Sequence, residues 1–295
     1  MAAKSSLRSF IGGKVDSFVT RALRSDVGRK LISMVLGSPL YKSVKDKVDR
    51  FRDKRLEELV RSRPLPQHMA VIMDGNRRYA RRLGLSEEEG HRLGRDKLQD
   101  ALDWCLDLGI KVLTVYAFST ENFKRNEREV RSLLNLCREE LERASKDSRI
   151  HRNQVRVNII GRLDLLPEEL RASAQHIMDA TKHYSKYILN IALAYGGRQE
   201  IIDALRKIAE DVKGNKLSIK DINEKTVSSY LYTKDVPDPD LIFRTSGEER
   251  ISNFLLWQLA YSELYFSDVY WPALRKRDFL RAIHTYQQRK RKFGR

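Results

Sequence analysis

Cysteine is scarce in this chain of 295 residues, which contains only Cys105 and Cys137. Two cysteines are too few for the disulfide framework of a small secreted domain or for a cysteine-rich zinc site. Both lie in apolar helical patterns, so we expect them to be small buried side chains in a reducing compartment. Long apolar runs are also missing, since none reaches the roughly 18 residues of a membrane span. The start of the chain does not resemble a signal peptide, because Lys14, Asp16 and Arg21 interrupt its apolar stretches. We therefore expect a cytoplasmic protein.

Several motifs of well-known enzyme classes are absent as well. No Gly-x-x-x-x-Gly-Lys-Ser/Thr loop occurs, and no Gly-x-Gly-x-x-Gly follows the first predicted strand, which argues against a P-loop nucleotidase and a Rossmann dinucleotide site. The Gly-x-Ser-x-Gly turn of the α/β-hydrolases is also missing. No two aspartates are adjacent, which excludes the aspartate-rich motifs of trans-type prenyltransferases and terpene cyclases.

Acidic residues are fewer than basic ones, 40 against 57, which gives a net charge of +17. The excess is confined to the two ends, with +9 in residues 1–63 and +8 in residues 275–295, so residues 64–274 are neutral. A nucleic-acid-binding fold usually carries a basic face on its folded body, so we expect no nucleic-acid partner. Residues 1–63 are a basic, loosely amphipathic N-terminal extension. Such a segment either binds peripherally to an anionic membrane surface or is a solvated extension.

Beyond Pro64 and Pro66, short apolar strands alternate with amphipathic helices over residues 64–295. Strands that are apolar along their whole length are typical of a parallel sheet with both faces buried. We therefore predict an α/β fold with a central parallel six-stranded sheet flanked by helices. The predicted strands are 68–73, 112–118, 155–160, 187–194, 241–243 and 264–266, and the predicted helices are 90–108, 130–141, 168–184 and 199–213.

Charged and polar residues follow several of these strands. Ligands of open parallel sheets bind just beyond the carboxyl ends of the strands. Five arginines lie at three of these ends, and guanidinium groups suit multi-oxygen anions such as phosphate, although a single arginine is more often a surface ion-pair partner. Asp74 and Glu263 are the acids best placed to hold a divalent cation together with phosphate oxygens. The five arginines are Arg77, Arg78, Arg125, Arg244 and Arg250.

Three parts of the sequence resemble the motifs of a known enzyme family. Residues 68–79, His-Met-Ala-Val-Ile-Met-Asp-Gly-Asn-Arg-Arg-Tyr, resemble the opening motif of the cis-prenyltransferases, the undecaprenyl and dehydrodolichyl diphosphate synthases. Residues 116–125 resemble the second motif, and residues 244–266 contain the last ones. The motifs occur in the family order, and the resemblance covers residues 64–295. The Arg77-Arg78 pair is typical of the archaeal or eukaryotic branch, as is Glu89-Gly-His91.

The resemblance implies the undecaprenyl diphosphate synthase fold with an apolar product tunnel, for which residues 98–106 and 130–141 are either candidate walls or ordinary core. It implies a transferase that uses Mg²⁺ to condense isopentenyl diphosphate repeatedly onto an allylic diphosphate, farnesyl or geranylgeranyl. The product would be a medium or long cis-polyprenyl diphosphate for a glycosyl-carrier lipid of the dolichol type. The alternative is a non-catalytic partner subunit of a heteromeric synthase, against which the presence of Asp74, Asn122 and Glu263 argues.

The resemblance also implies roles for individual residues. Asp74 and Asn122 would be catalytic, the first by promoting departure of the allylic diphosphate and the second as a proton acceptor. Asp74 and Glu263 would hold Mg²⁺. The substrate-binding residues would be Gly75, Asn76, Arg77, Arg78, Tyr79, His91, Ser119, Thr120, Glu121, Phe123, Arg125, Arg244, Arg250, Ile251, Ser252 and Gly294.

The C-terminal residues 291–295 resemble the Arg-x-Gly terminus of the family, with Lys292 in place of an arginine. In the family this tail crosses a dimer interface towards the diphosphate site of the partner. A chain that has both this tail and the full catalytic set is expected to be a homodimer. One position departs from the bacterial pattern, since Glu87 stands where many bacterial members carry an arginine.

Overall fold

The computed structural model describes residue 34 and residues 38–289, and it divides into two compact units, Met1–Leu59 and Val60–Arg295. The first unit contains most of helix α4 (Pro39–Arg61). Residues 1–33 and 35–37 of the predicted membrane-binding extension lie outside the described residues, as does the predicted substrate-binding residue Gly294. Among the helices that are described, none is long and apolar enough to cross a membrane.

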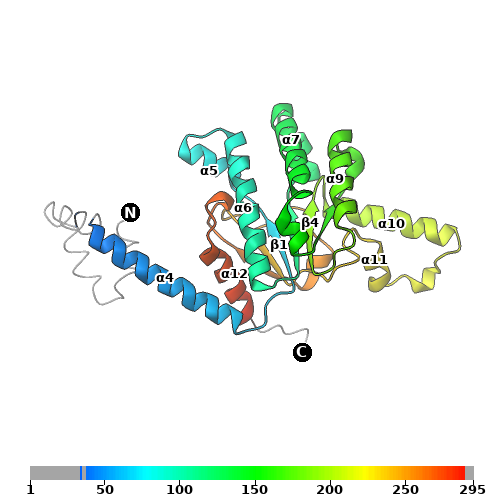
Figure 1. Ribbon diagram of the computed structural model, residues 1–295. Helices are drawn as coiled ribbons and strands as arrows, with labels where there is room; N and C mark the ends of the chain where they lie inside the picture. The colour runs from blue at the N-terminus through cyan, green and yellow to red at the C-terminus, as the bar shows by residue number, and fades with distance from the viewer. Residues whose placement is uncertain (1–33, 35–37, 290–295) are drawn as a thin grey trace. The chain divides into compact units, whose positions relative to one another are not determined.

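The second unit is built on one six-stranded sheet in the order β3-β4-β2-β1-β5-β6. Figure 1 labels two of these strands, β1 and β4, among the helices that flank them. All neighbouring strands are parallel. The predicted α/β fold with its six parallel strands is confirmed, and no predicted strand end differs by more than two residues. The strands are β1 (His68–Ile72), β2 (Val112–Tyr116), β3 (Val155–Ile160), β4 (Tyr187–Ala192), β5 (Leu241–Arg244) and β6 (Glu263–Phe266).

Helices connect and flank the strands of this unit. Helix α6 begins three residues before its predicted start, because the Ser86 side chain accepts a hydrogen bond from the Glu89 backbone and the Glu89 carboxylate accepts one from the Ser86 backbone. Helix α12 was not among the predicted helices. The helices are α5 (Asn76–Leu83), α6 (Glu87–Leu108), α7 (Glu127–Ala144), α8 (Ser148–Arg152), α9 (Glu168–Thr181), α10 (Gly197–Lys213), α11 (Glu224–Tyr230) and α12 (Lys276–Gln288), with short 3-10 turns η1 (Thr120–Lys124), η2 (Leu163–Leu165), η3 (Ile219–Asp221), η4 (Gln258–Tyr261) and η5 (Trp271–Ala273).

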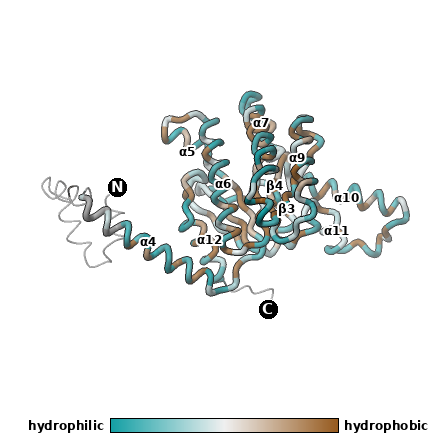
Figure 2. Tube along the Cα trace, in the orientation of Figure 1, coloured by the Kyte–Doolittle hydropathy of each residue, from teal (hydrophilic) through white to brown (hydrophobic). Residues whose placement is uncertain are grey.

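Both faces of the sheet are buried. One face carries Ala70 and Ile242, which form a core cluster with Phe254. The opposite face carries Phe243, whose ring centroid lies 6.5 Å from that of Phe279 on α12. In Figure 2 the helices alternate between teal and brown along their length, as expected for helices with one buried face. Burial on two faces explains why the strands are apolar along their whole length.

One row of polar side chains crosses the buried sheet. His68 Nε2 lies 2.7 Å from Thr114 Oγ1, Asn190 donates to Thr114 at 3.0 Å, and Asn158 donates to Asn190 at 2.9 Å. His68 Nδ1 must be a donor, because it lies 2.6 Å from the carbonyl oxygen of Pro237. Nε2 therefore accepts the Thr114 hydroxyl hydrogen and the imidazole is neutral. Burial lowers the pKa of His68 to about 4, which favours the same state.

Candidate active site

A cleft of about 840 Å³ lies at the carboxyl ends of β1, β2 and β5. The three strands are neighbours in the sheet, so the polar segments that follow them meet at one edge. The cleft collects most of the predicted site residues. These are Asp74, Gly75, Asn76, Arg77, Arg78, His91, Ser119, Glu121, Asn122, Arg125, Arg244, Arg250 and Ser252.

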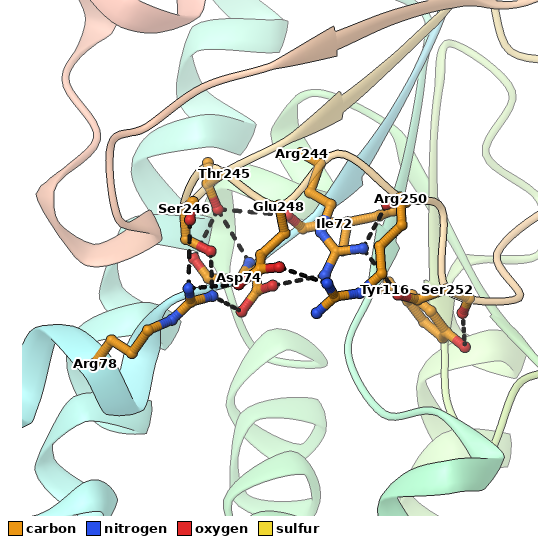
Figure 3. Close-up of polar contacts among 10 residues, drawn as sticks. All are labelled: Ile72, Asp74, Arg78, Tyr116, Arg244, Thr245, Ser246, Glu248, Arg250 and Ser252. Carbon is orange, nitrogen blue, oxygen red and sulfur yellow. Dashed lines mark hydrogen bonds and ion pairs between the residues drawn. The ribbon is translucent and has the colours of Figure 1, made fainter.

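Asp74 is the centre of an ion-pair cluster in this cleft (Figure 3). One carboxylate oxygen accepts a hydrogen bond from Arg78 at 3.1 Å and the other accepts one from Arg244 at 2.7 Å. Burial alone would raise the pKa of Asp74, but the hydrogen bonds and charges of Arg244 and Arg78 outweigh it and hold this pKa below its usual value. The carboxylate is therefore ionised over the whole physiological pH range.

The same cluster extends to two further charged residues. Arg78 donates to Glu248 at 2.7 Å, and Arg250 forms an ion pair with Glu248 at 2.5 Å. Three guanidinium groups therefore share two carboxylates, which leaves one positive charge in excess. Arg244 is only 4% exposed, and its buried Nε has no hydrogen-bond partner within the described part of the chain. The cluster has unused capacity for an anion.

Arg244 also fixes the loop that follows its strand. It donates to the hydroxyl of Ser252 at 2.8 Å and to the carbonyl oxygen of Arg250. The loop contains non-glycine residues with positive φ, among them Ser252 at 48° and Asn253 at 62°. Such backbone is costly, so these contacts are needed to hold it.

A second group of basic residues gathers around Glu129 of α7. Its carboxylate lies 3.5 Å from Arg77, 2.9 Å from Arg125 and 3.7 Å from His91 Nε2. Burial lowers the pKa of His91, and the positive charges of Arg125 and Arg77 lower it further, whereas the negative charge of Glu129 raises it; the net effect is a lowered pKa. Glu87, at the position that departs from the bacterial pattern, pairs with Arg77 at 3.9 Å. The basic residues of the cleft therefore form two sets, one around Asp74 and one around Glu129.

Gly75 sits at the junction of β1 and α5, where it caps the helix with a φ of 102°. A Cβ atom there would lie 2.7 Å from the Tyr270 ring and 2.9 Å from Ser246 Cβ. The chain therefore needs glycine at this point, and the first turn of α5 is left facing the cleft. Free N–H groups at a helix N-terminus favour anions.

The segment that follows β2 forms the opposite wall. The side-chain oxygen of Asn122 accepts a hydrogen bond from the Ser119 backbone N–H at 3.0 Å. The Tyr116 hydroxyl lies 3.2 Å from the carbonyl oxygen of Tyr195 and 3.3 Å from that of Ser252, and donates to one of them at a time. These contacts hold the loops after β2, β4 and β5 against one another.

Some residues of the cleft were not predicted. Asn253 lines it and donates to Glu121 at 2.9 Å, which joins the loop after β5 to the segment after β2. Arg81 and Glu248 also line it. Arg81 could have been found from its place one helical turn after Arg77 on α5.

Other predicted residues lie outside the cleft lining. Tyr79 packs edge-on against Tyr270 with ring centroids 6.4 Å apart, and Phe123 packs against Phe118 at 4.9 Å. These two aromatic residues support the walls of the cleft. Thr120 and Ile251 are also outside the lining.

Glu263 is a correction to the predicted placement. It is the first residue of β6 and is paired in register with Leu241, the first residue of β5, whereas Asp74 follows the end of β1. Leu241 is level with Met69, so Asp74 and Glu263 are separated by five residues along the strands, about 16 Å. Glu263 instead accepts a hydrogen bond from Arg289 at 2.6 Å. The two predicted metal ligands are therefore not brought together within one chain.

A smaller cavity of about 120 Å³ lies between α6, α7 and the sheet. Part of its lining is shared with the cleft, so the two lie side by side. Cys105 is buried as predicted, whereas Cys137 is partly exposed and lines this cavity. The shared residues are Met73, Asn76, His91, Ala117 and Leu133, and most others are apolar, among them Leu98, Leu136, Leu141, Ile191, Leu193 and Trp271.

Known proteins share both this sequence and this fold. The family model described as putative undecaprenyl diphosphate synthase matches residues 72–294. A tritrans,polycis-undecaprenyl-diphosphate synthase (geranylgeranyl-diphosphate specific) from Methanopyrus kandleri is 56% identical over 243 residues, covering 82% of this chain and 90% of the relative. The enzyme of the same name from Thermococcus kodakarensis is 52% identical over 256 residues, covering 87% and 96%.

Among solved structures, lavandulyl diphosphate synthase from Lavandula x intermedia in complex with dimethylallyl diphosphate is similar, with a TM-score of 0.75 and 34% identity over 78% of this chain and 99% of that one. A probable undecaprenyl diphosphate synthase from Campylobacter jejuni gives a TM-score of 0.64 and 35% identity, covering 79% and 99%. These matches confirm the resemblance read from the sequence motifs. The chain belongs to the undecaprenyl diphosphate synthase family of cis-prenyltransferases and is a transferase.

Proposed function

We propose that this protein elongates an allylic diphosphate by successive condensations with isopentenyl diphosphate, giving a medium or long cis-polyprenyl diphosphate for a glycosyl-carrier lipid. The observation that carries the proposal is the cleft at the carboxyl ends of β1, β2 and β5, which two separate segments, the start of α5 and the loop after β5, line with arginines. The names of the archaeal relatives support geranylgeranyl diphosphate as the allylic primer in preference to farnesyl diphosphate.

Two anionic substrates must lie close together without repelling each other, which requires separate cationic sites. We assign the allylic diphosphate to the start of α5, where the backbone N–H groups of Gly75 and Asn76 adjoin the guanidinium groups of Arg77 and Arg78, with His91 beside them. We assign isopentenyl diphosphate to the loop after β5. Arg244, Arg250 and Ser252 would hold it there.

The donor set at Asp74 fits Mg²⁺. Mg²⁺ is usually held by one or two carboxylates together with substrate phosphate oxygens, and the ionised Asp74 supplies one carboxylate in the cleft. No cluster of three or more potential protein ligands occurs among the described residues, so the substrate must complete the set. Bound there, the ion would supply positive charge to the departing diphosphate.

The protein's own groups have distinct tasks in the reaction. Arg77 and Arg78 would stabilise the negative charge that develops as the allylic carbon–oxygen bond breaks. Asn122 is already committed as an acceptor to the Ser119 backbone, and an amide is a weak base. We therefore assign Asn122 to positioning the loop at the reacting carbons. A diphosphate oxygen would take the proton that is lost after carbon–carbon bond formation.

The apolar cavity supports a tunnel for the growing chain, because it adjoins the cleft and lies between α6, α7 and the sheet. The leucines at 98, 133, 136 and 141 line it, and all four lie in the two segments that the sequence offered as candidate walls. Within the same proposal the protein is a homodimer, with the tail that contains Gly294 directed to the partner's diphosphate site. Residues 1–63 would bind the membrane that receives the product.

Incubation of the purified protein with Mg²⁺, geranylgeranyl or farnesyl diphosphate and labelled isopentenyl diphosphate tests the proposal. The products are sized after phosphatase treatment. Asp74→Asn keeps the shape of the side chain but removes its charge, so turnover should fall about 100- to 1000-fold. Asp164→Asn is the matched control, since its ion pair with Arg162 lies on the surface and its side chain is 60% exposed.

Absence of any elongated product from the wild-type protein, with or without detergent, would overturn the proposal. Product formation only after a second, different subunit is added would instead favour the alternative of a non-catalytic partner.

A further inference from the structure

The apolar cavity beside the cleft contains an ion pair that the proposed chemistry does not use. Arg95 of α6 and Glu140 of α7 both line the cavity, and Arg95 Nη1 lies 3.3 Å from Glu140 Oε1. Their side chains are 21% and 23% exposed. The pair bridges the two helices that form the wall of the cavity.

The pair lies beyond the part of the cavity that adjoins the cleft. Helices α6 and α7 both begin at the cleft, where His91 and Leu133 line the two cavities together. Arg95 comes one helical turn after His91, and Glu140 comes two turns after Leu133, which is about 10 Å along α7. A chain that grows from the cleft along α7 therefore passes Leu136 and Cys137 before it reaches Glu140.

Neighbouring charges hold the pair in place. Arg95 also forms an ion pair with Asp96 at 2.8 Å, and Glu140 forms one with Arg143 at 3.3 Å. Moving either member away would break contacts on both helices. The pair is consequently the centre of a four-residue arrangement, in which the Arg95–Glu140 contact is the one that spans the two helices.

The volume of the cavity limits how much of a hydrocarbon chain fits beside this pair. Its volume of about 120 Å³ is below that of the cavity of about 150 Å³ that accommodates one benzene molecule in an engineered protein core. A polyprenyl chain of many five-carbon units must push the wall apart or pass along it. Hydrocarbon that covers these groups removes their water, and burying a charge without its partner is strongly unfavourable.

We infer that the Arg95–Glu140 pair limits product length, and that it does so by closing the wall between α6 and α7 against the growing chain. The inference rests on the proposed function. A chain that reaches the pair stops growing, because further growth requires the pair to open and its charges to lie against hydrocarbon. The two residues are therefore specificity-determining residues for product length, and they take no part in the chemistry at the diphosphates.

The double variant Arg95→Ala/Glu140→Ala tests this inference with the same elongation assay. Its main product should be longer than that of the wild type by at least one five-carbon unit, because both the charges and the bulk are removed. Arg138→Ala/Glu142→Ala is the matched control, because it removes an ion pair of 2.7 Å on α7 that does not line the cavity.

An unchanged or shortened product from the alanine double variant overturns the inference. If circular dichroism shows that this variant does not fold, Arg95→Met/Glu140→Met replaces it, since methionine keeps much of the bulk without charge. Wild-type length in the methionine variant also overturns the inference. Failure of the proposed function is recognised separately, because the wild-type protein would then give no elongated product at all.

Discussion

His68 is a buried histidine whose protonation the surrounding sheet opposes. Its Nδ1 donates to the Pro237 carbonyl and its Nε2 accepts from Thr114, so a second ring proton would point at a hydroxyl group that already donates to the ring. Thr114 also accepts from Asn190, so protonation of the ring would set two donors against one hydroxyl group and remove the hydrogen bond from that hydroxyl to Nε2. The row of hydrogen bonds thus fixes both the tautomer and the charge of one residue.

This arrangement predicts a loss of stability in acid. The pKa of His68 falls from 6.5 in the unfolded chain to about 4 in the folded protein. Between these values the unfolded chain binds a proton that the folded protein does not, so stability decreases as the pH is lowered from 6.5 to 4. The full loss is roughly 3 kcal/mol, at about 1.4 kcal/mol for each pKa unit.

Urea unfolding of the wild type and of His68→Gln across this pH range measures the effect. The variant cannot be protonated there and should show a flatter dependence, whatever its absolute stability. His176→Gln, at an exposed position, should keep the wild-type slope. Equal slopes for the wild type and His68→Gln would contradict the prediction.

Residue chemistry alone predicted Asp74 and the arginines of the cleft, because charged residues that follow the strands of a parallel sheet meet at its carboxyl edge. Other cleft residues, such as His91 and Ser119, were predicted only from the family resemblance. The pattern misplaced Glu263, which precedes the predicted strand 264–266 and therefore lies at the amino end of β6, away from the cleft. It also missed Asn253, whose role depends on a backbone with a φ of 62° and on contacts with distant Glu121. Contacts of that kind have no signature in a local pattern.

At the scale of the element, the start and the end of the short helix α5 are each fixed by a glycine. It has eight residues, and glycines with positive φ flank it on both sides, Gly75 at 102° and Gly84 at 71°. The two glycines differ in their surroundings. A Cβ at Gly75 would collide with Tyr270 and Ser246, whereas nothing lies within 4 Å of a Cβ at Gly84.

The pair provides a matched test. Gly84→Ala should cost about 1–2 kcal/mol of stability, because alanine disfavours left-handed backbone. Gly75→Ala carries the same backbone cost and roughly 1–3 kcal/mol more from overpacking. It should also shift the start of α5 relative to Asp74 and reduce turnover, which Gly84→Ala should leave near the wild-type level. Urea midpoints and the elongation assay measure both effects, and equal effects of the two substitutions on turnover would contradict this account.

Elements were easier to predict than their ends. The strand at residues 155–160 was predicted without error because β-branched residues stand next to a terminating glycine. Helix α12 was missed, although Phe279 and Ile283 recur at helical spacing, because basic residues dominate that part of the sequence. Its burial against Phe243 depends on the sheet, which a local pattern does not contain.

For the molecule as a whole, the net positive charge and the arginines of the cleft lie in different parts of the sequence. Residues 64–274 are neutral in sum, yet six of their arginines line one cleft, because the sheet brings distant strand ends together. The net charge of +9 belongs to residues 1–63, which precede the first strand of the sheet in the sequence. Under the proposed function the substrate is water-soluble and the product becomes increasingly apolar, which gives a reason for such a separation, since an apolar product would partition into lipid.

The N-terminal charge therefore predicts binding to anionic membranes. Each Lys or Arg near such a surface contributes about 1 kcal/mol, and the attraction weakens as salt shortens the screening length. The full chain should sediment with phosphatidylserine-containing vesicles at low salt, less so at high salt, and weakly with phosphatidylcholine vesicles at any salt. A chain that begins at Arg63 keeps the sheet, the cleft and the C-terminal basic residues but lacks most of the N-terminal charge, so its binding should be much weaker. Equal binding by the two chains would show that the extension is not the membrane contact. Salt-independent binding of the full chain would show that the contact is apolar rather than electrostatic.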